Sequence, residues 1–194
     1  MTDFEKQISF IMELDKIKKI TRQTYLSDGS RKENDAEHSW HLALMAFVLA
    51  DYAKEKIDVQ KTMLMVLIHD IVEIDAGDTY AYDEKGKLSQ REREVKAADR
   101  IFSLLPKDQA KSMRDLWEEF ETCETPEAKF ARCMDNLQPI LLNDKTGGKS
   151  WRERQIKRSQ VEERQKRTKM GSDTLMEVVT QIIEKNVENG KAMC

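Results

Sequence analysis

The sequence feature that most constrains this chain is residues 63–78, MLMVLIHDIVEIDAGD, where an apolar run passes directly into a group of ionisable side chains. The first six residues are all apolar, which is the pattern of an element buried on every side. The remaining ten include His69, Asp70, Glu73 and Asp78. Burying such groups costs solvation free energy unless a partner such as a metal ion compensates for it. A lone histidine would suggest a hydrogen-bonded core residue, but the His-Asp pair followed by a Glu favours a site.

We expect this segment to belong to one central helix of about residues 59–75. Asp58 can cap the start of that helix, and Gly77 supplies a stop signal at its end. Glu73 would then lie four positions after His69 and three after Asp70, so that the three side chains would share one side of the helix.

Composition and the spacing of apolar residues elsewhere predict a single all-α domain that spans residues 1–194. The chain is 36% charged and 7% aromatic and contains seven glycines and three prolines. This composition suits helices with solvated outer faces and disfavours a sheet-rich fold. Asn34, Ser89 and Thr125 are candidate helix caps. Apolar residues at helical spacing predict further helices at about residues 3–20, 34–53, 89–105, 107–121, 126–142 and 173–188.

Two connecting segments between these helices are predicted to be loops. Residues 21–32 are of mixed character and contain a turn signal at Asp28-Gly29. Residues 80–88 are polar and follow Asp78 closely, so that they could form the rim of a pocket.

Two later segments contain signals that we interpret conservatively. Residues 144–150, DKTGGKS, include Gly-Lys-Ser, but a phosphate-binding loop would need a glycine in place of Asn143 and a preceding strand. We therefore expect a flexible loop there. The basic stretch at 151–169 is predicted to be a solvated helix face, because Glu residues dilute its charge.

Charge and cysteine content exclude several classes of protein. The formal net charge is -3 and the pI is about 5.8, so nothing indicates a general binder of nucleic acids or anionic membranes. Three cysteines without CxxC spacing argue against a disulfide framework or a structural zinc site. No apolar run approaches the roughly 20 residues of a membrane span, and the first residues lack the apolar core of a signal peptide. We therefore expect a cytoplasmic protein.

Ionisable side chains also stand among apolar residues in two other predicted helices. His38 lies near the start of one of them and Asp135 in the middle of another. Together with His69 and Asp70 they would supply two imidazoles and two carboxylates, a donor set suited to one divalent first-row ion with positions left open for water. For Asp135 alone, the simpler interpretation is a salt bridge to Arg132 or to another arginine.

The order H…HD…D and its surroundings resemble the HD-domain superfamily, and within it the 5'-deoxynucleotidases and their eukaryotic relatives. An HD dipeptide alone is a weak signal, whereas EHS, then HDxxE with GD downstream, then a helical Asp form a specific combination. The resemblance covers about residues 5–145 as the core of the domain and leaves a C-terminal helical extension at about 150–190. It rests on NDAEHSW at 34–40, HDIVEIDAGD at 69–78, LWEEFET at 116–122 and EAKFARCMDN at 127–136.

The resemblance implies a role for each of the unusual residues. The implied metal ligands are His38, His69, Asp70 and Asp135. Glu73 would be the catalytic carboxylate that orients or deprotonates the attacking water, and Asp78 a catalytic acid of the pocket near the sugar or leaving group. Arg22 and Arg132 would bind the phosphate of the substrate. His41 matches no ligand position, and we interpret it as a packing residue or as a support for a ligand.

These roles predict a hydrolase that removes phosphate from (deoxy)nucleoside 5'-monophosphates with one divalent ion, for which Mn, Co, Fe, Zn, Ni and Mg are candidates. Gln23 departs from the bacterial enzymes, which have a tryptophan there, so a related hydrolase of another small phosphate ester is an alternative. A second alternative is a non-catalytic helical binding protein that keeps its metal for structure, although such a site would need neither Glu73 nor Asp78. A di-iron HD oxygenase would need more ligands than three histidines readily supply.

The resemblance also implies the partners of the chain. The substrate would be a small phosphorylated molecule, and neither a nucleic-acid polymer nor a membrane is expected as a partner. A homodimer is expected because dimers are common in the family. The candidate contacts are the apolar sides of the helices at 107–121 and 173–188.

Overall fold

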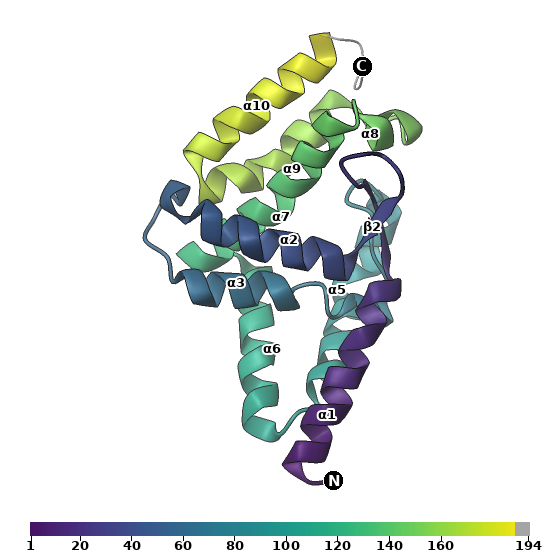
Figure 1. The fold of residues 1–194 in the computed structure, drawn as a ribbon, viewed down its shortest axis with the longest axis vertical. Coiled ribbons are helices and arrows are strands. Elements are labelled where there is room, and N and C mark those ends of the chain that lie inside the picture. The colour runs from purple at the N-terminus through teal and green to yellow at the C-terminus, as the bar shows by residue number, and fades with distance from the viewer. Residues whose placement is uncertain (189–194) are drawn as a thin grey trace.

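The chain folds into a helical body with one short antiparallel hairpin (Figure 1). This structure is a computed structural model and describes residues 1–188, so the end of the predicted domain, residues 189–194, lies outside the described part. The prediction of an all-α fold is confirmed, and no helix in the described range is both long and apolar enough to cross a membrane. The elements are α1 (Asp3–Leu14), η1 (Asp15–Lys19), β1 (Thr21–Tyr25), β2 (Lys32–Asn34), α2 (Asp35–Val48), η2 (Ala50–Tyr52), α3 (Val59–Ile68), α4 (Glu73–Ala76), α5 (Glu84–Phe102), α6 (Lys107–Thr122), α7 (Pro126–Lys145), α8 (Lys149–Glu153), α9 (Arg158–Gly171) and α10 (Asp173–Glu188).

The core forms around α7, which packs against α2, α3 and α9. Apolar side chains on several faces of α7 are buried, among them Phe130, Met134 and Leu137, because helices surround it. A second apolar cluster joins α1, α5 and α6, with Phe102 and Trp117 at its centre. The predicted ligands lie on α2, on α7 and just after α3, so the packing of the core also determines the geometry of the site.

The predicted helix over residues 59–75 is interrupted in the structure. α3 begins as expected, with the Asp58 carboxylate accepting a hydrogen bond from a backbone amide of the first turn. It ends at Ile68, however, and α4 begins only at Glu73. The predicted stop signal is confirmed, because Gly77 ends α4 with a φ of 73°.

The turn between α3 and α4 has a tertiary cause. His69 Nδ1 lies 2.7 Å from the carbonyl oxygen of Val66, and Trp117 Nε1 donates to the carbonyl oxygen of His69 over 3.2 Å. These side chains engage two carbonyl groups that a continuous α-helix would pair with its own amides. The Glu73 amide instead donates to the Asp70 carbonyl oxygen, three residues back, over 2.9 Å. Because Trp117 belongs to α6, no local sequence signal announces this break.

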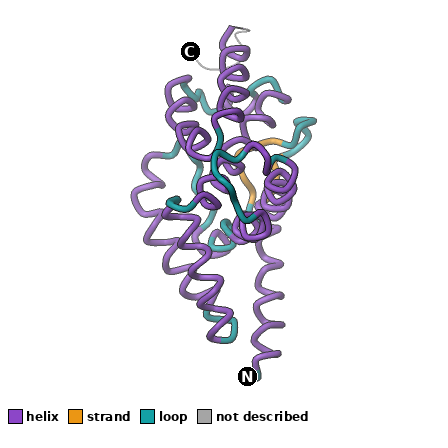
Figure 2. The backbone as a smooth tube through the Cα atoms, turned by 90° about the vertical axis from the view of Figure 1, so that its left-hand side faces the viewer, coloured by secondary structure: helices purple, strands orange, loops and turns teal. Residues whose placement is uncertain are grey.

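Residues 21–32, predicted to be a loop, form most of the hairpin of β1 and β2 (orange in Figure 2). The strands pair antiparallel, with Thr21 opposite Asn34. The predicted turn at Asp28-Gly29 closes the hairpin, and the glycine has a φ of 70°, which other residues adopt only with strain. The loop prediction is therefore wrong here. It was made because the strands are too short to show a clear alternation of apolar and polar residues.

The predicted loop at 80–88 is shorter in the structure, because α5 begins at Glu84 rather than after Ser89. The Asp83 carboxylate caps α5 by accepting hydrogen bonds from two backbone amides of the first turn. Of the predicted flexible loop at 144–150, only residues 146–148 lie between α7 and α8, and the rest is helical. The helix α7, not a strand, precedes the Gly-Lys-Ser sequence. This arrangement agrees with the rejection of a phosphate-binding loop.

The prediction of a solvated helix at 151–169 is only partly correct. The main helix of this region, α9, packs along α7 and buries the side chains of Gln165 and Thr168. At the end of α9, a Cβ atom on Gly171 would lie 2.5 Å from the carbonyl oxygen of Lys129. Only glycine therefore permits this close approach of the two helices. The C-terminal extension is part of the core.

Candidate metal centre

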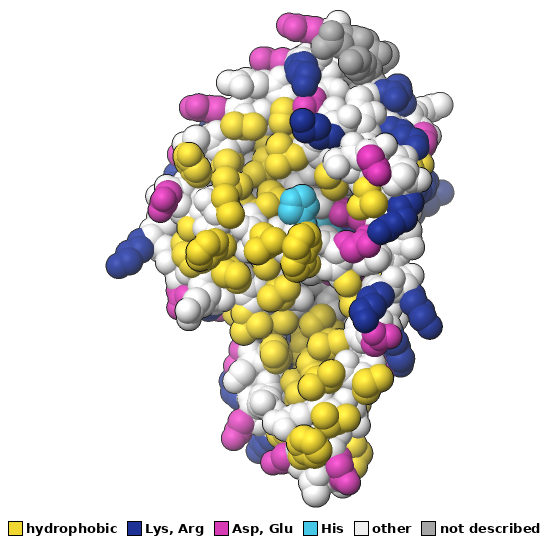
Figure 3. Space-filling model, viewed as in Figure 1, with side chains coloured by type: hydrophobic (Ala, Val, Ile, Leu, Met, Phe, Trp, Pro, Cys, Tyr) yellow, Lys and Arg dark blue, Asp and Glu magenta, His cyan; other side chains and the backbone are white. Residues whose placement is uncertain are grey.

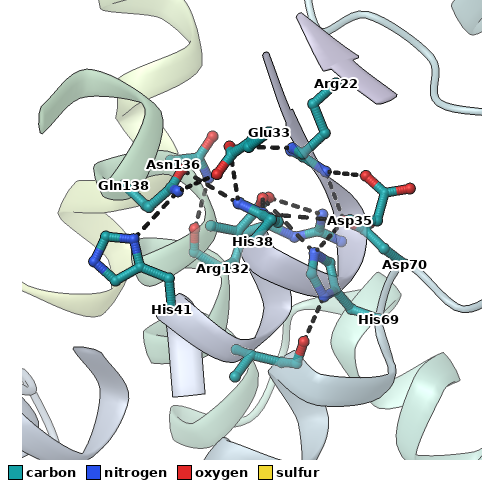
Figure 4. Close-up of polar contacts among 12 residues, drawn as sticks. Arg22, Glu33, Asp35, His38, His41, His69, Asp70, Arg132, Asn136 and Gln138 are labelled. Atoms are coloured by element: carbon teal, nitrogen blue, oxygen red, sulfur yellow. Dashed lines mark hydrogen bonds and ion pairs between the residues drawn. The ribbon is translucent and has the colours of Figure 1, made fainter. Parts of the chain in front are cut away.

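The predicted metal ligands His38, His69 and Asp70 lie close together in the core (Figure 4), and Asp135 lies beside the two imidazoles. His38 comes from α2, Asp135 from α7, and His69 and Asp70 from the turn after α3. His38 Nε2 lies 3.3 Å from Asp135 Oδ1, and His69 Nε2 lies 3.0 Å from Asp70 Oδ2. The cross distances, His38 Nε2 to Asp70 Oδ2 and His69 Nε2 to Asp135 Oδ1, are both 3.9 Å. Donor atoms of His38, His69 and Asp135 lie within 4.8 Å of one another, and Asp70 Oδ2 adjoins both imidazoles. These four side chains are here called the ligand ring.

The second nitrogen of each imidazole is held by a neighbour, which fixes how the ring faces the centre. His38 Nδ1 lies 3.2 Å from Gln138 Oε1, and His69 Nδ1 lies 2.7 Å from Val66 O. When Nδ1 carries the proton and donates it, Nε2 keeps a lone pair directed at the centre. His69 Nε2 is buried and makes no hydrogen bond within the described residues. A buried polar atom without a partner is costly, and a divalent ion would satisfy it.

The charges of the ligand ring also suit a metal ion. Burial would raise the pKa of Asp135, but the hydrogen bond to His38 and the charge of His69 hold it well below its usual range. Burial and Arg22 lower the pKa of His38, yet Asp135 and Glu33 outweigh them and raise it to about 9. Without a metal ion, a proton on the His38 imidazole supplies the positive charge that faces the carboxylates. Metal binding would displace that proton.

Arg22, predicted to bind phosphate, lies beside the ligand ring and has carboxylate partners there. Its Nη1 lies 2.7 Å from Asp70 Oδ2 and 3.1 Å from Asp35 Oδ1, and its Nε lies 3.7 Å from Glu33 Oε1. Burial would lower the pKa of Arg22, but nearby carboxylates, first that of Asp70, raise it well above its ordinary value. In this structure its charge holds Asp70 and Asp35 in place.

Arg132 and His41 take supporting positions. Arg132 Nη1 lies 3.6 Å from Asp135 Oδ2, and its Nη2 lies 3.0 Å from Glu121 Oε1. Asp135 therefore makes the predicted ion pair with Arg132, and it also faces the two imidazoles. His41 lies outside the ligand ring, with its Nδ1 3.4 Å from Gln138 Nε2. Gln138 thus connects it to the first imidazole.

The predicted catalytic carboxylates lie next to the ligand ring, where burial favours their protonated forms. Glu73 begins α4 and is buried, and its Oε2 makes no hydrogen bond within the described residues. Burial, followed by the charges of Asp70 and Asp35, raises its pKa well above the usual value. A cation bound at the ligand ring would favour the carboxylate form of Glu73, which could then accept a proton from water. Burial also raises the pKa of Asp78, which lines the same pocket.

Sequence reasoning misses an inner group of polar residues around Asp35. This side chain is fully buried, and one of its oxygens lies within 4.8 Å of oxygens of Asp70 and Glu73. Its sequence signal is its position three residues before the first histidine, on the same helix face. Glu33 and Gln138 are also missed. In the structure, Gln138 Nε2 donates a hydrogen bond to Glu33 Oε2 over 2.8 Å. They belong to β2 and α7, so only the tertiary fold brings them together.

A cavity of about 990 Å³ opens beside the ligand ring. Tyr80 and Tyr82 line it, with ring centroids 5.3 Å apart, so the predicted rim is confirmed. Arg164 and Arg167 of α9 also reach the cavity, which the prediction of a solvated helix face did not anticipate. The predicted site residues that line it are Arg22, His69, Asp70, Glu73, Asp78, Arg132 and Asp135.

Known proteins resemble this chain in sequence and in fold. The family model described as HD domain matches residues 14–176. The crystal structure of a predicted metal-dependent phosphohydrolase from Magnetospirillum magnetotacticum MS-1 is 47% identical, with a TM-score of 0.94, over 97% of this chain and 95% of that chain. The 5'-deoxynucleotidase HDDC2 of Homo sapiens is 30% identical over 135 residues, which are 69% of this chain and 65% of that protein. The 5'-deoxynucleotidase hdd1 of Schizosaccharomyces pombe is 26% identical over 138 residues, 69% of this chain and 68% of that protein. The chain therefore spans slightly less than two thirds of the human relative's length.

Proposed function

The chain belongs to the HD-domain family, and from that membership we propose that it is a metal-dependent phosphohydrolase of (deoxy)nucleoside 5'-monophosphates. The observation that carries this proposal is the ligand ring, with two imidazoles facing two carboxylates, next to the buried Glu73. The names of the human and fission-yeast relatives, both 5'-deoxynucleotidases, support the substrate class. The reaction is hydrolysis of a phosphate monoester, in which water attacks phosphorus and the bond to the nucleoside oxygen breaks.

The ligand ring fits one divalent ion, because a mixed set of imidazole and carboxylate donors accepts Mn, Co, Fe, Zn, Ni or Mg. Held by His38, His69, Asp70 and Asp135, the ion would lower the pKa of a water molecule and offset the charge of the phosphate. A metal kept only for structure is the competing proposal. It would leave the ionisable Glu73 buried without a function that offsets its solvation cost.

The neighbouring residues divide the remaining steps of the proposed mechanism. Glu73, in the carboxylate form that a bound cation would favour, takes the proton of the attacking water. Arg22 holds Asp70 in position, and Arg132 adds positive charge beside the phosphate. Asp78, also in the cavity, is placed to contact the sugar or to return a proton to the leaving oxygen.

Gln23 motivates a second candidate substrate class. It lines the cavity, and its Oε1 accepts hydrogen bonds from Lys32 Nζ, over 2.6 Å, and from Arg154. The wall at this position is therefore polar, and it lacks the aromatic face on which a nucleobase could stack. A related hydrolase of another small phosphate ester is the alternative that this observation favours.

A metal-swap assay against a substrate panel tests the proposal. The protein is stripped of metal, reloaded with each candidate ion, and incubated with ribo- and deoxynucleoside 5'-monophosphates and with other small phosphate esters, and phosphate release is measured. Preference for the nucleoside monophosphates supports the proposal, whereas turnover of other esters alone supports the alternative. Metal-bound protein that hydrolyses none of them contradicts both enzymatic proposals and favours a binding protein.

We also propose that the protein is a cytoplasmic homodimer, with a contact surface different from the predicted one. On α6, one of the predicted contacts, Trp117 and Phe120 are buried within the chain. Exposed apolar side chains gather instead over α1, α2 and α3 (Figure 3). An exposed apolar area of this kind is typical of a protein interface. It includes Ile8, Ile11, Trp40, Leu44, Phe47, Val48, Leu64 and Leu67.

Light scattering at micromolar concentration tests the homodimer. We expect a dimer for the wild type and a monomer for Phe47→Ser, because a polar side chain would disrupt the apolar contact around α2. Val178→Ser, on the exposed side of α10, is the matched control and should remain dimeric. A strictly monomeric wild type would refute the dimer. Dissociation of Val178→Ser but not of Phe47→Ser would indicate that the contact surface is on α10.

A further inference from the structure

Arg164 differs from the two predicted phosphate-binding arginines because it has no carboxylate partner among the described residues. Arg22 and Arg132 each contact at least two carboxylates. Arg164 of α9 is half-buried and lines the cavity, but no carboxylate oxygen within residues 1–188 lies within 4.0 Å of its guanidinium. A guanidinium has five N–H donors, so Arg164 keeps donors that no acidic side chain occupies.

The helix that carries Arg164 is fixed to the helix that carries Asp135. Gln165, the next residue, is fully buried, and its Nε2 donates to the Asn136 carbonyl oxygen over 3.2 Å. Thr168 Oγ1 donates to Gln165 Oε1 over 2.6 Å, which orients that amide. Because Asn136 directly follows Asp135, these bonds hold this turn of α9 at the level of the ligand ring. Arg164 therefore has a defined position, unlike an arginine on a freely solvated helix.

Arg164 shares its cavity with Asp135 of the ligand ring and with the two tyrosines of the aromatic wall. Burial raises the pKa of Tyr80 and Tyr82, and Arg164 opposes that rise in both. The guanidinium, the ring and the tyrosines therefore all border one cavity. A phosphate monoester that reaches the ring with its phosphate and the tyrosines with its organic part would pass beside it.

Arg167, one turn later on α9, adds a second positive charge to this part of the cavity. Burial lowers its pKa, and the like charges of Arg132 and Arg164 lower it further. Three guanidinium groups are therefore near one another at the same cavity. Like charges in such proximity disfavour one another unless an anion joins them, and a phosphate dianion supplies both the charge and several acceptor oxygens.

We propose that Arg164 binds the phosphate oxygens of the substrate at the ligand ring, with Arg167 adding positive charge from the next turn. The ligand class is a phosphate monoester dianion, and inorganic phosphate, the reaction product, carries the same group. The inference rests on the proposed function for its substrate. Binding of a phosphate dianion can nevertheless be measured without any turnover.

Calorimetric titration of the manganese-loaded protein with inorganic phosphate tests the proposal. Arg164→Gln should weaken phosphate binding by about tenfold to a hundredfold, the usual scale for losing hydrogen bonds between charged groups. The phosphate affinity of Arg164→Lys should lie between those of the wild type and Arg164→Gln, because a lysine keeps the charge but loses the paired donors. Lys166→Gln removes the same charge from the exposed side of α9 and should bind phosphate as the wild type does.

Metal content and melting temperature, measured on the same preparations, should be unchanged in Arg164→Gln, and KM for a phosphate ester should rise. Wild-type phosphate affinity in this variant, an equal loss in Lys166→Gln, or a loss of metal from Arg164→Gln would overturn the inference. Metal-loaded wild type that binds no phosphate would also overturn it. Phosphate binding that depends on Arg164, in a protein that hydrolyses no nucleotide, would support the inference and contradict the proposed function.

Discussion

At the scale of the residue, the two imidazoles of the ligand ring are held in the way that metal-binding histidines are held. A core histidine is satisfied by hydrogen bonds to ordinary neighbours. Here one nitrogen of each ring contacts an amide oxygen or a carbonyl, and the other faces two carboxylates. Asp70 and Asp135 both face the imidazoles, whereas Glu73 lies near Asp35 and Asp70 but makes no ion pair with either imidazole within the described residues.

This division predicts different effects for substitutions only a few residues apart. Glu73→Gln keeps the size of the side chain and its capacity for hydrogen bonds but removes the proton acceptor. We expect metal content and melting temperature to stay near wild type, while kcat falls by roughly a hundredfold or more, the usual scale for a positioned general base. Metal stoichiometry and kcat measured on one preparation check this.

His69→Ala is the comparison variant and should lose metal and activity together, because it removes a donor of the ligand ring. If Glu73→Gln turns over normally, the assignment of the base is wrong. If Glu73→Gln loses its metal, the carboxylate is a ligand.

The proposed ligands could be identified from sequence because two are adjacent and each stands out among apolar neighbours. Asp35 could not be distinguished from an ordinary acid at a helix start, which the helix dipole already favours. Arg164 could not be identified from sequence for a different reason. An arginine that faces the cavity from within a basic stretch has the same sequence pattern as its solvated neighbours. Only the packing of α9 on α7 shows which of these arginines faces the cavity.

At the scale of the element, local signals predicted helix starts well but failed where distant side chains take over backbone hydrogen bonds. Asp58, Asn34 and Thr125 cap their helices as expected, because a cap involves only residues close in sequence. The break after α3 depends instead on Trp117 of α6. The hairpin was missed because pairing with another segment, rather than local preference, decides so short a strand.

The role of Trp117 in that break can be tested by substitution. Trp117→Phe removes the donor to the His69 carbonyl oxygen and leaves that oxygen buried without its hydrogen-bond partner. We expect metal affinity to fall by about tenfold or more, as for other residues that orient a ligand, together with a lower melting temperature. Trp40→Phe, at an exposed tryptophan, is the control and should leave metal affinity unchanged. Unchanged metal affinity in Trp117→Phe would show that the turn is held by other contacts.

The contact between α9 and α7 leads to a second prediction at this scale. In Gly171→Ala the new Cβ would lie 2.5 Å from a backbone oxygen and 2.6 Å from Cys133 Cβ, so the helices must separate. We expect the free energy of unfolding to fall by about 1–3 kcal/mol, measured by denaturant titration. Lys169→Ala, exposed on the same helix, should be neutral. Equal stability of Gly171→Ala and wild type would contradict the close packing.

At the scale of the whole molecule, the ligand ring joins α2, the turn after α3, and α7 around one point of the core. Removing the ion should therefore lower the stability of the entire domain. At a metal concentration a hundred times Kd, binding contributes about 2.7 kcal/mol. We expect chelation to lower the melting temperature and abolish activity, and manganese or cobalt to restore both better than calcium, which prefers more oxygen ligands. Full activity in excess chelator, with no metal found by elemental analysis, would refute the metal centre.

The docking of α9 has a consequence for how such a chain can change over generations. The proposed ligands lie between residues 38 and 135, whereas the opposing wall with Arg164 and Arg167 comes from a helix beyond residue 157. Under the proposed function, the arginines of α9 and the proposed ligands are thus encoded in separate stretches of the gene. Mutation or exchange of α9 can alter this part of the cavity wall while the proposed ligands are inherited intact. New specificities can arise in this fold without rebuilding its chemistry.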